Sequence, residues 1–235
     1  MSGRKPSILT IIPARGGSKG IRDKSIAPIN VRPMIAYSIQ VALNSKVFDR
    51  VVVSTDSHKI AATARSLGVE VPFLRPKRLA RDKTPGILPI LHAIQWLEKN
   101  EGYRSDYVMC LQPTSPLRTV MDIKKAVALA EKRKADGVVS VSPVEHHPYW
   151  MKKVNRQGRM SDFMLLARAI ARRQDLPSVY ALNGAIYLAR REILLNRKTW
   201  YTKRTYAYPM PRERSLDIDT PWDLHLAELI LKEKR

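Results

Sequence analysis

The residues whose types and spacing best suit chemistry form a glycine-rich, basic loop near the amino terminus. The loop reads Ala14-Arg15-Gly16-Gly17-Ser18-Lys19-Gly20-Ile21-Arg22-Asp23-Lys24. It follows an apolar run at 8–12 that predicts a buried parallel strand. Glycines let backbone N–H groups approach a ligand closely, and the cations Arg15, Lys19 and Lys24 can surround a polyphosphate. For the loop taken alone, a solvated basic turn is the simpler alternative. The spacing matches neither G-x-G-x-x-G nor the Walker loop.

A pair of carboxylates near the other end of the chain could act together with this loop. The segment reads Ser215-Leu216-Asp217-Ile218-Asp219-Thr220-Pro221. If a strand ends here, Asp217 and Asp219 project to the same face. Their mutual repulsion then favours a bridging cation, and Mg²⁺ is the hard ion that joins carboxylates to phosphates. Capping of a helix that begins near Pro221, most simply by Thr220, is expected too, but it leaves Asp217 without a role.

These segments and several others together resemble one enzyme family. The further segments are Val52-Val53-Ser54-Thr55-Asp56, Phe73-Leu74-Arg75-Pro76, Leu111-Gln112-Pro113-Thr114-Ser115-Pro116-Leu117-Arg118 and Asn183-Gly184-Ala185-Ile186-Tyr187. In this order, over nearly the whole chain, they resemble the CMP-sialic acid synthetases, or acylneuraminate cytidylyltransferases, and their legionaminic-acid relatives.

The resemblance implies a reaction of CTP with a nine-carbon 2-keto sugar acid, giving the CMP-sugar and pyrophosphate. The protein must then neutralise charge, align the groups in line and remove one proton. The matched positions make Lys24 the residue that stabilises charge near the α-phosphate, with Arg15 and Lys19 on the triphosphate. Asp217 and Asp219 would hold Mg²⁺ against the phosphates.

The resemblance also implies two sets of binding residues. The nucleotide set is Ala14, Arg15, Gly16, Gly17, Ser18, Lys19, Lys24, Ser25 and Arg75, the last matched to the cytosine contact. The sugar set is Gln112, Arg173, Asn183, Tyr187, Trp200 and Tyr201. Arg173 fits an arginine that pairs with the sugar carboxylate, and Trp200 and Tyr201 fit an aromatic pair that packs on its N-acyl group.

Several alternatives stay open. No histidine is placed by a motif, so the general base is undecided, as is the choice between one metal ion and two. Ser25 stands where the family usually has asparagine, and Lys83-Thr84-Pro85-Gly86 has fewer hydroxyls than the family's turn. These departures leave the sugar open. The same fold acting on the eight-carbon ketodeoxyoctonate, or a non-catalytic basic nucleotide- or RNA-binding module, are the competing functions.

Composition fits one domain with a sizeable core. The chain has 235 residues, 44% of them hydrophobic. No stretch of about 18 apolar residues predicts a membrane span, and the start lacks the apolar segment of a signal peptide. Because Cys110 is the single cysteine, no intrachain disulfide can form. We therefore expect a cytoplasmic protein.

The charge is unusual, because 42 Lys and Arg against 21 Asp and Glu give +21. Such a field attracts polyanions. The cations are spread along the chain, and no helix-turn-helix, zinc-finger or RNP motif accompanies them, so we do not expect specific nucleic-acid binding. Two anionic substrates account for part of the charge.

Apolar strands alternate with amphipathic helices, which predicts an α/β fold with a Rossmann-like, mostly parallel sheet flanked by helices. Strands are expected at 8–13, 50–54, 107–111, 138–144 and 184–189, with an extended segment at 70–74. Helices are expected at 34–44, 58–67, 88–99, 121–134 and 221–232. The alternation lapses at 146–180, where a helix at 163–172 has no strand partner. In the resembling family this insertion is an arm that packs across a homodimer; a tetramer is an open alternative.

Overall fold

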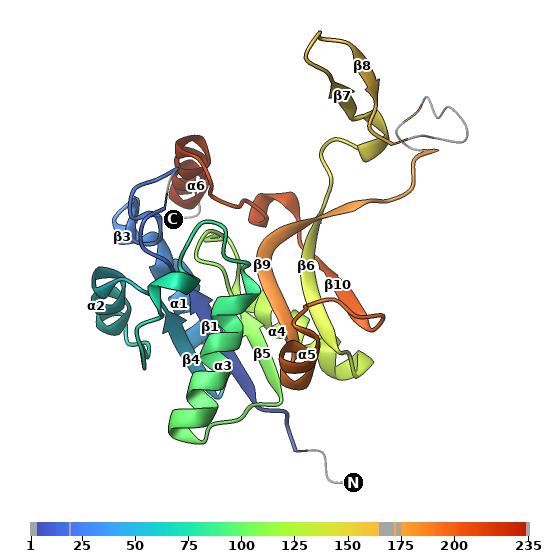
Figure 1. Ribbon diagram of the computed structural model, residues 1–235. Helices are drawn as coiled ribbons and strands as arrows, with labels where there is room; N and C mark the ends of the chain where they lie inside the picture. Colours follow the sequence, from blue (N-terminus) through green and yellow to red (C-terminus); the bar gives the residue numbers. More distant parts are fainter. Residues whose placement is uncertain (1–3, 19, 165–171, 173–174, 234–235) are drawn as a thin grey trace.

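A six-stranded sheet forms the centre of the protein in this computed structural model, which describes residues 4–18, 20–164, 172 and 175–233 (Figure 1). The strand order is β10-β6-β9-β5-β1-β4. The strands are β1 Ile8–Pro13, β4 Arg50–Ser54, β5 Tyr107–Cys110, β6 Gly137–Pro143, β9 Tyr180–Arg190 and β10 Thr205–Pro209. Neighbours pair in parallel except at β9, which is antiparallel to β5 and β6. The predicted mostly parallel α/β sheet is confirmed.

Helices cover both faces of this sheet. The helices of the described chain are α1 Met34–Ser45, α2 His58–Ser66, α3 Ile87–Glu101, α4 Val120–Arg133, α5 Arg191–Arg197 and α6 Pro221–Glu233. Helices α1, α2 and α4 pack on one face, and α3 and α5 on the other. In β1, Ile8 and Ile12 therefore enter one core while Leu9 and Ile11 enter the other. A strand covered on both faces is apolar along its whole length, as this run is.

Smaller elements complete the chain. A hairpin of β2 Pro28–Ile29 and β3 Arg32–Pro33 forms a third apolar cluster with α6. Short 3₁₀ helices are η1 Lys24–Ile26, η2 Lys77–Leu79, η3 Pro148–Trp150 and η5 Arg212–Arg214. In the part of the chain that the structure describes, no helix combines the length and the apolar character needed to cross a bilayer.

The predicted core strands and helices are all present, with shifted ends. The segment at 70–74 makes two isolated bridges, Val52 to Glu70 and Thr55 to Leu74. The strand end that the sequence analysis considered at Asp217 and Asp219 is not present, because residues 215–219 belong to no ladder. The Ile218 N–H donates to the Thr114 carbonyl (2.9 Å), and Asn183 of β9 donates to Ser215 Oγ (3.0 Å), so these residues are tied to the sheet region without joining it. Strand β10, helix α5 and both hairpins were not predicted.

The insertion between β6 and β9 extends away from the sheet (Figure 1). The two strands stay paired as far as Pro143 and Tyr180. Beyond them, β7 Lys152–Val154 pairs with β8 Met160–Asp162 in an antiparallel hairpin. The helix predicted at 163–172 lies mostly outside the described residues, and its first two positions form a bend.

Candidate active site

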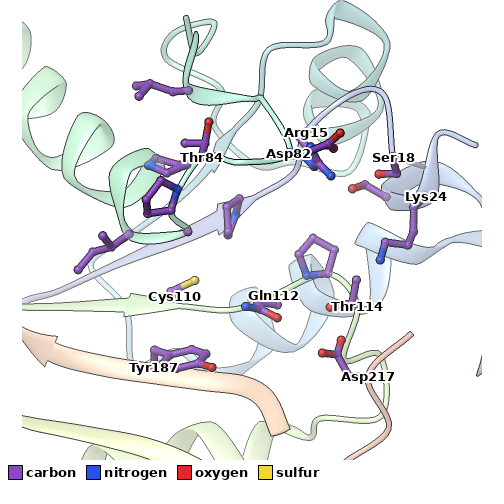
Figure 2. A pocket seen from close by; sticks show the side chains of 18 of the residues that line it. Arg15, Ser18, Lys24, Asp82, Thr84, Cys110, Gln112, Thr114, Tyr187 and Asp217 are labelled. Carbon is purple, nitrogen blue, oxygen red and sulfur yellow. The ribbon is translucent and has the colours of Figure 1, made fainter. Parts of the chain in front are cut away.

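A cavity of about 800 Å³ lies at the carboxyl ends of β1 and β5 (Figure 2). Ligands of open α/β sheets bind at this edge. Distant parts of the chain line it, and the predicted site residues among them are Arg15, Ser18, Lys24, Ser25, Arg75, Gln112, Tyr187, Trp200, Tyr201, Asp217 and Asp219. The structure therefore brings most of the predicted set around one space. Lys19 and Arg173 lie outside the described residues.

The loop after β1 is held by its backbone. The Ala14 N–H donates to the Ser54 carbonyl (3.0 Å), and the Gly16 N–H donates to Asp56 Oδ1 (3.0 Å). Gly17 has a φ of 70°, which a residue with a side chain rarely adopts. Ala14, Gly16 and Gly17 do not line the cavity wall, so in this structure they shape the loop.

Lys24 connects the loop to the carboxyl-terminal segment. Its Nζ donates to Asp219 Oδ1 (2.8 Å) and to the Ile218 carbonyl (3.0 Å). Gly20 also lies close to the carboxyl-terminal segment, because a Cβ on this residue would stand 2.7 Å from the Asp219 carbonyl oxygen. The two ends of the sequence thus meet at the cavity, as the sequence reasoning required.

Asp217 has an unusual environment. Its Oδ1 is buried and has no hydrogen-bond partner among the residues described. Burial is the main cause that raises the pKa of Asp217, and the Asp219 carboxylate raises it further, while Thr114 and Lys24 oppose the shift. A Cβ on Gly184 would lie 3.1 Å from Asp217 Oδ2 and 2.8 Å from Gln112 Oε1, so only glycine allows this close packing.

The carboxylates of Asp217 and Asp219 are a donor set for a hard cation. An unpartnered buried carboxylate oxygen is costly unless a positive group meets it. Mg²⁺ commonly takes one or two carboxylates and completes its shell with water and phosphate. No cluster of three or more His, Cys, Asp or Glu is present among the described residues, so the chain offers these two carboxylates and no closed protein cage.

Two arginines, Arg15 and Arg75, line the part of the cavity where the sequence analysis expects the nucleotide. Arg15 donates from Nη1 to Asp82 Oδ1 (2.6 Å) and to the Ala80 carbonyl (3.3 Å). Arg75 is only 4% exposed, and its Nε and Nη2 have no hydrogen-bond partner among described residues. Its Nη2 lies 3.7 Å from Asp56 Oδ1, and burial lowers its pKa. Arg75 therefore lines the cavity with a buried guanidinium whose Nε and Nη2 donate no hydrogen bond to a described residue and whose ion-pair partner is Asp56. Asp82 was missed by the sequence analysis.

Aromatic side chains form the opposite wall. The Tyr187 and Trp200 rings pack with centroids 5.6 Å apart and planes tilted by 45°. Burial raises the pKa of Tyr187 to about 12. Its phenol therefore stays protonated and can donate to a ligand at neutral pH.

Asn183 stands behind this wall. Its Oδ1 accepts from Ser140 Oγ (2.6 Å) and from the Ala185 N–H (3.2 Å), and its Nδ2 donates to Ser215 Oγ (3.0 Å). It is buried and does not line the cavity. The structure places it as a tie between β6, β9 and the Asp217 segment, and its predicted sugar contact is not part of this arrangement.

Arg118 is a further residue to which the sequence analysis gave no role. Its fully buried guanidinium donates to Ser38 Oγ (2.6 Å), the Ala185 carbonyl (2.9 Å) and the Gln112 carbonyl (3.3 Å). Burial lowers its pKa to about 10. It holds the main chain that presents Gln112 to the cavity. The sequence feature that could have indicated Arg118 is its position at the end of the Leu111-to-Arg118 motif.

Curated proteins are similar to this chain over most of its length. The N-acylneuraminate cytidylyltransferase of Streptococcus agalactiae serotype V is 37% identical over 214 residues, 90% of this chain and 50% of that protein. The CMP-N,N′-diacetyllegionaminic acid synthase of Legionella pneumophila is 35% identical, over 96% of both chains. The pseudaminic acid cytidylyltransferase of Campylobacter jejuni is 33% identical, over 95% and 96%. The chain thus spans about half the length of the streptococcal relative and nearly all of the other two.

A solved structure shares the fold. CMP-2-keto-3-deoxy-manno-octonic acid synthetase, determined with CTP, superposes with a TM-score of 0.73 at 17% identity, covering 97% of this chain and all of the other. A family model described as cytidylyltransferase matches residues 9–235. This chain belongs to the cytidylyltransferase family.

Proposed function

We propose that this protein transfers CMP from CTP to a nine-carbon 2-keto sugar acid of the sialic or legionaminic type, releasing pyrophosphate. The observation that carries the proposal is the meeting of Lys24 with Asp219 at a cavity whose other wall is aromatic. Cations and carboxylates suit a polyphosphate, and aromatic rings with hydroxyl groups suit a sugar with an acyl substituent. Relatives named for such sugar acids cover the chain at 33–37% identity.

The nucleotide end supplies charge and orientation. Arg15 and the loop backbone bind the triphosphate, and Lys24 stabilises the charge that develops at the α-phosphate. Lys19 is assigned to the triphosphate from the sequence alone. Arg75, with donors that no described residue uses, is suited to the carbonyl oxygen of cytosine.

Asp217 and Asp219 are proposed to hold Mg²⁺. Support comes from the partnerless Oδ1 of Asp217 and the open Asp219 carboxylate beside it. When bound, the ion supplies Lewis-acid neutralisation of phosphate charge. The chain's own contribution is to fix both carboxylates: Ile218 is buried between them, and Asp223 accepts from the Asp219 N–H (3.0 Å).

The sugar end and the arm complete the proposal. Gln112 and Tyr187 would hydrogen-bond the sugar, and Trp200 and Tyr201 would pack against its acyl group. Arg173, proposed from sequence to pair with the sugar carboxylate, belongs to the arm. The arm is proposed to form a homodimer, since it exposes the apolar side chains of Trp150, Met151, Val154, Met160 and Phe163. We place the reaction in the cytoplasm.

Pyrophosphate release tests the function directly. CTP is incubated with N-acetylneuraminic, N,N′-diacetyllegionaminic, pseudaminic or ketodeoxyoctonic acid, with Mg²⁺ or with EDTA. We expect Mg²⁺-dependent release with at least one nine-carbon acid. Release with ketodeoxyoctonic acid alone would establish the alternative substrate. No release with any acid, together with salt-sensitive RNA binding, would favour a non-catalytic module.

A further inference from the structure

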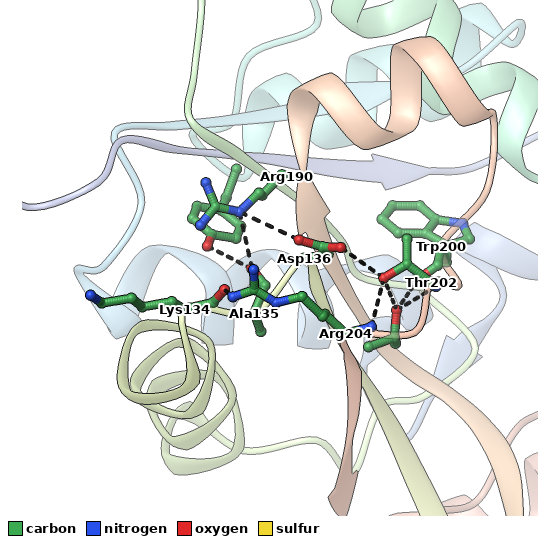
Figure 3. A network of polar contacts seen from close by, with 9 residues as sticks. Lys134, Ala135, Asp136, Arg190, Trp200, Thr202 and Arg204 are labelled. Atoms are coloured by element: carbon green, nitrogen blue, oxygen red, sulfur yellow. Dashed lines mark hydrogen bonds and ion pairs between the residues drawn. The ribbon is translucent and has the colours of Figure 1, made fainter.

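The loop that brings Trp200 and Tyr201 to the cavity is held by polar contacts on its far side (Figure 3). The loop joins α5 to β10, and Tyr201 is 49% exposed. A half-exposed aromatic residue on a loop gains little from burial that would offset the entropy of ordering the chain. Trp200 packs on Tyr187 and on the core beneath α3 and α5, but apolar packing alone does not account for the position of Tyr201.

Thr202 is the centre of these contacts. Its Oγ1 donates to Asp136 Oδ2 (2.9 Å) and accepts from the Arg204 N–H (3.0 Å). Its own N–H donates to Thr205 Oγ1 (2.8 Å), and that hydroxyl donates to the Trp200 carbonyl (3.1 Å). Two hydroxyl groups therefore connect the main chain of Trp200 to the Asp136 carboxylate.

Asp136 is itself fixed directly before β6, an inner strand of the sheet. Its N–H donates to the Arg204 carbonyl (3.1 Å), and its carbonyl accepts from the Arg190 N–H (2.8 Å). The Arg190 Nε lies 3.9 Å from Asp136 Oδ1. The carboxylate that receives the Thr202 hydroxyl is thus anchored from two other elements.

Gly137 sets how closely the loop approaches the sheet. A Cβ at this residue would lie 2.9 Å from the Leu188 carbonyl oxygen and 3.3 Å from the Trp200 carbonyl oxygen. Both neighbours are backbone atoms, so neither can rotate away. The first residue of β6 must therefore be small for Trp200 to sit where it does.

We propose that Asp136, Gly137 and Thr202 are positioning residues that set the place of the Trp200–Tyr201 wall and so the acyl substituent that the site accepts. None of the three lines the cavity. Their printed contacts are with the loop and with the sheet behind it, so an effect on the sugar would pass through the wall. The inference rests on the proposed function, because the wall is assigned there to the sugar.

The test compares Thr202→Val with Thr202→Ser. Valine keeps the shape but loses the hydroxyl that bonds to Asp136, whereas serine keeps it. With the best acid of the panel, Thr202→Val should raise the KM for the acid about 10-fold, the scale of one lost hydrogen bond that misplaces a binding group. The KM for CTP should stay within about twofold, and Thr202→Ser should resemble the wild type in both.

A second measurement reads the position of the wall without catalysis. Hydrogen–deuterium exchange of the peptide over 198–205 should be faster in Thr202→Val than in the wild type or Thr202→Ser. Gly137→Ala reaches the same wall from the sheet side and should give the same pattern. Thr63→Val, which removes a hydroxyl bonded to the Lys59 carbonyl on α2, serves as the control and should change neither readout.

Each outcome is decisive. An unchanged KM for the acid in Thr202→Val, or a rise in both KM values together, would overturn the proposal. If the wild type turns over none of the acids, the proposed function fails, and exchange over 198–205 still decides whether Thr202 and Asp136 hold the loop. Unchanged exchange there would refute the positioning role by itself.

Discussion

At the scale of single residues, the ion pair of Lys24 and Asp219 separates function from stability. The Lys24 side chain is 18% exposed, and that of Asp219 is 73% exposed. A pair that is open to water on one side contributes little to folding. Substitution of Asp219 therefore reports on chemistry with little disturbance of the fold.

We predict that Asp219→Ala lowers turnover by on the order of 10²–10³, the scale of losing a group that stabilises transition-state charge. The thermal midpoint should shift little. Glu192→Ala, which removes an exposed carboxylate on α5, is the control. Pyrophosphate release and a thermal melt measure the two effects, and full turnover in Asp219→Ala would remove the metal assignment.

Arg75, unlike Asp219, is almost fully buried, and its Nε and Nη2 donate no hydrogen bond to a described residue. We predict that Arg75→Met raises the KM for CTP about 100-fold, because a charged hydrogen bond to the base is lost. Stability should change little, because the removal of a buried guanidinium with unmet donors is offset by the loss of its ion pair with Asp56 (3.7 Å). Urea unfolding and steady-state kinetics are the measurements. A destabilised variant with an unchanged KM would show that Arg75 has a structural role.

At the scale of elements, the sequence predicted those whose pattern is set by burial on two faces. The run at β1 and the helices that cover it follow from such patterns. Strand β10 was not predicted, because its residues Thr205–Pro209 are half-exposed at the sheet edge and the strand is too short to show a clear alternation of apolar and polar side chains. The Asp217 segment alternates like a strand but belongs to no ladder, and separate bonds to Thr114, Asn183 and Lys24 hold it.

The site was predictable to the same extent. Side chains that we propose to meet a ligand, such as Lys24 and Asp219, belong to motifs at recognisable spacing. Asp82, Arg118 and Thr202 act on other side chains or on the backbone, and their partners lie far away in sequence. Such pairings depend on the packed fold, so a motif alone does not indicate them.

Helix α4 provides a prediction about pH. Its N-terminus has a capping box, in which Asp122 accepts from the Thr119 N–H (2.9 Å) while the Thr119 hydroxyl accepts from the Asp122 N–H (3.2 Å). Burial alone would raise the pKa of Asp122, but bonds from Arg214, Thr119 and Tyr208 outweigh it and lower that pKa. A carboxyl whose pKa is lower in the folded than in the unfolded state stabilises the fold at pH values above its unfolded pKa. This stabilisation is lost as the pH falls through the folded pKa.

We therefore predict that Asp122→Asn destabilises the protein by about 2 kcal/mol at pH 7. The difference from wild type should begin to shrink as the pH falls below 3.8, where the unfolded carboxyl becomes protonated, and should vanish once the pH lies below the lowered pKa of the folded state, where the wild-type carboxyl is protonated too. Urea unfolding of both proteins at pH 7 and at stepwise lower pH measures this. A difference that stays constant to the lowest pH would contradict the assigned cause.

At the scale of the whole molecule, the arm is notable for apolar side chains that are exposed to water. Its hairpin β7–β8 places Val154 opposite Met160, and these side chains are 64% and 68% exposed. A two-stranded hairpin on its own is marginally stable in water. An exposed apolar pair on such a hairpin therefore favours burial against a second protein surface, and a second copy of the chain is the proposed one.

We predict that the wild type sediments at twice the 26.8 kDa chain mass and that Met160→Glu shifts it toward the monomer. The added charge would have to be buried in the interface, which costs more than the apolar contact contributes. Ser161→Glu adds the same charge at the neighbouring position, opposite Lys153, where successive side chains of a strand face the other way. That variant should stay dimeric. A wild type that is monomeric at every concentration, or a dimer that tolerates glutamate at residue 160, would leave the exposed pair without the partner proposed here.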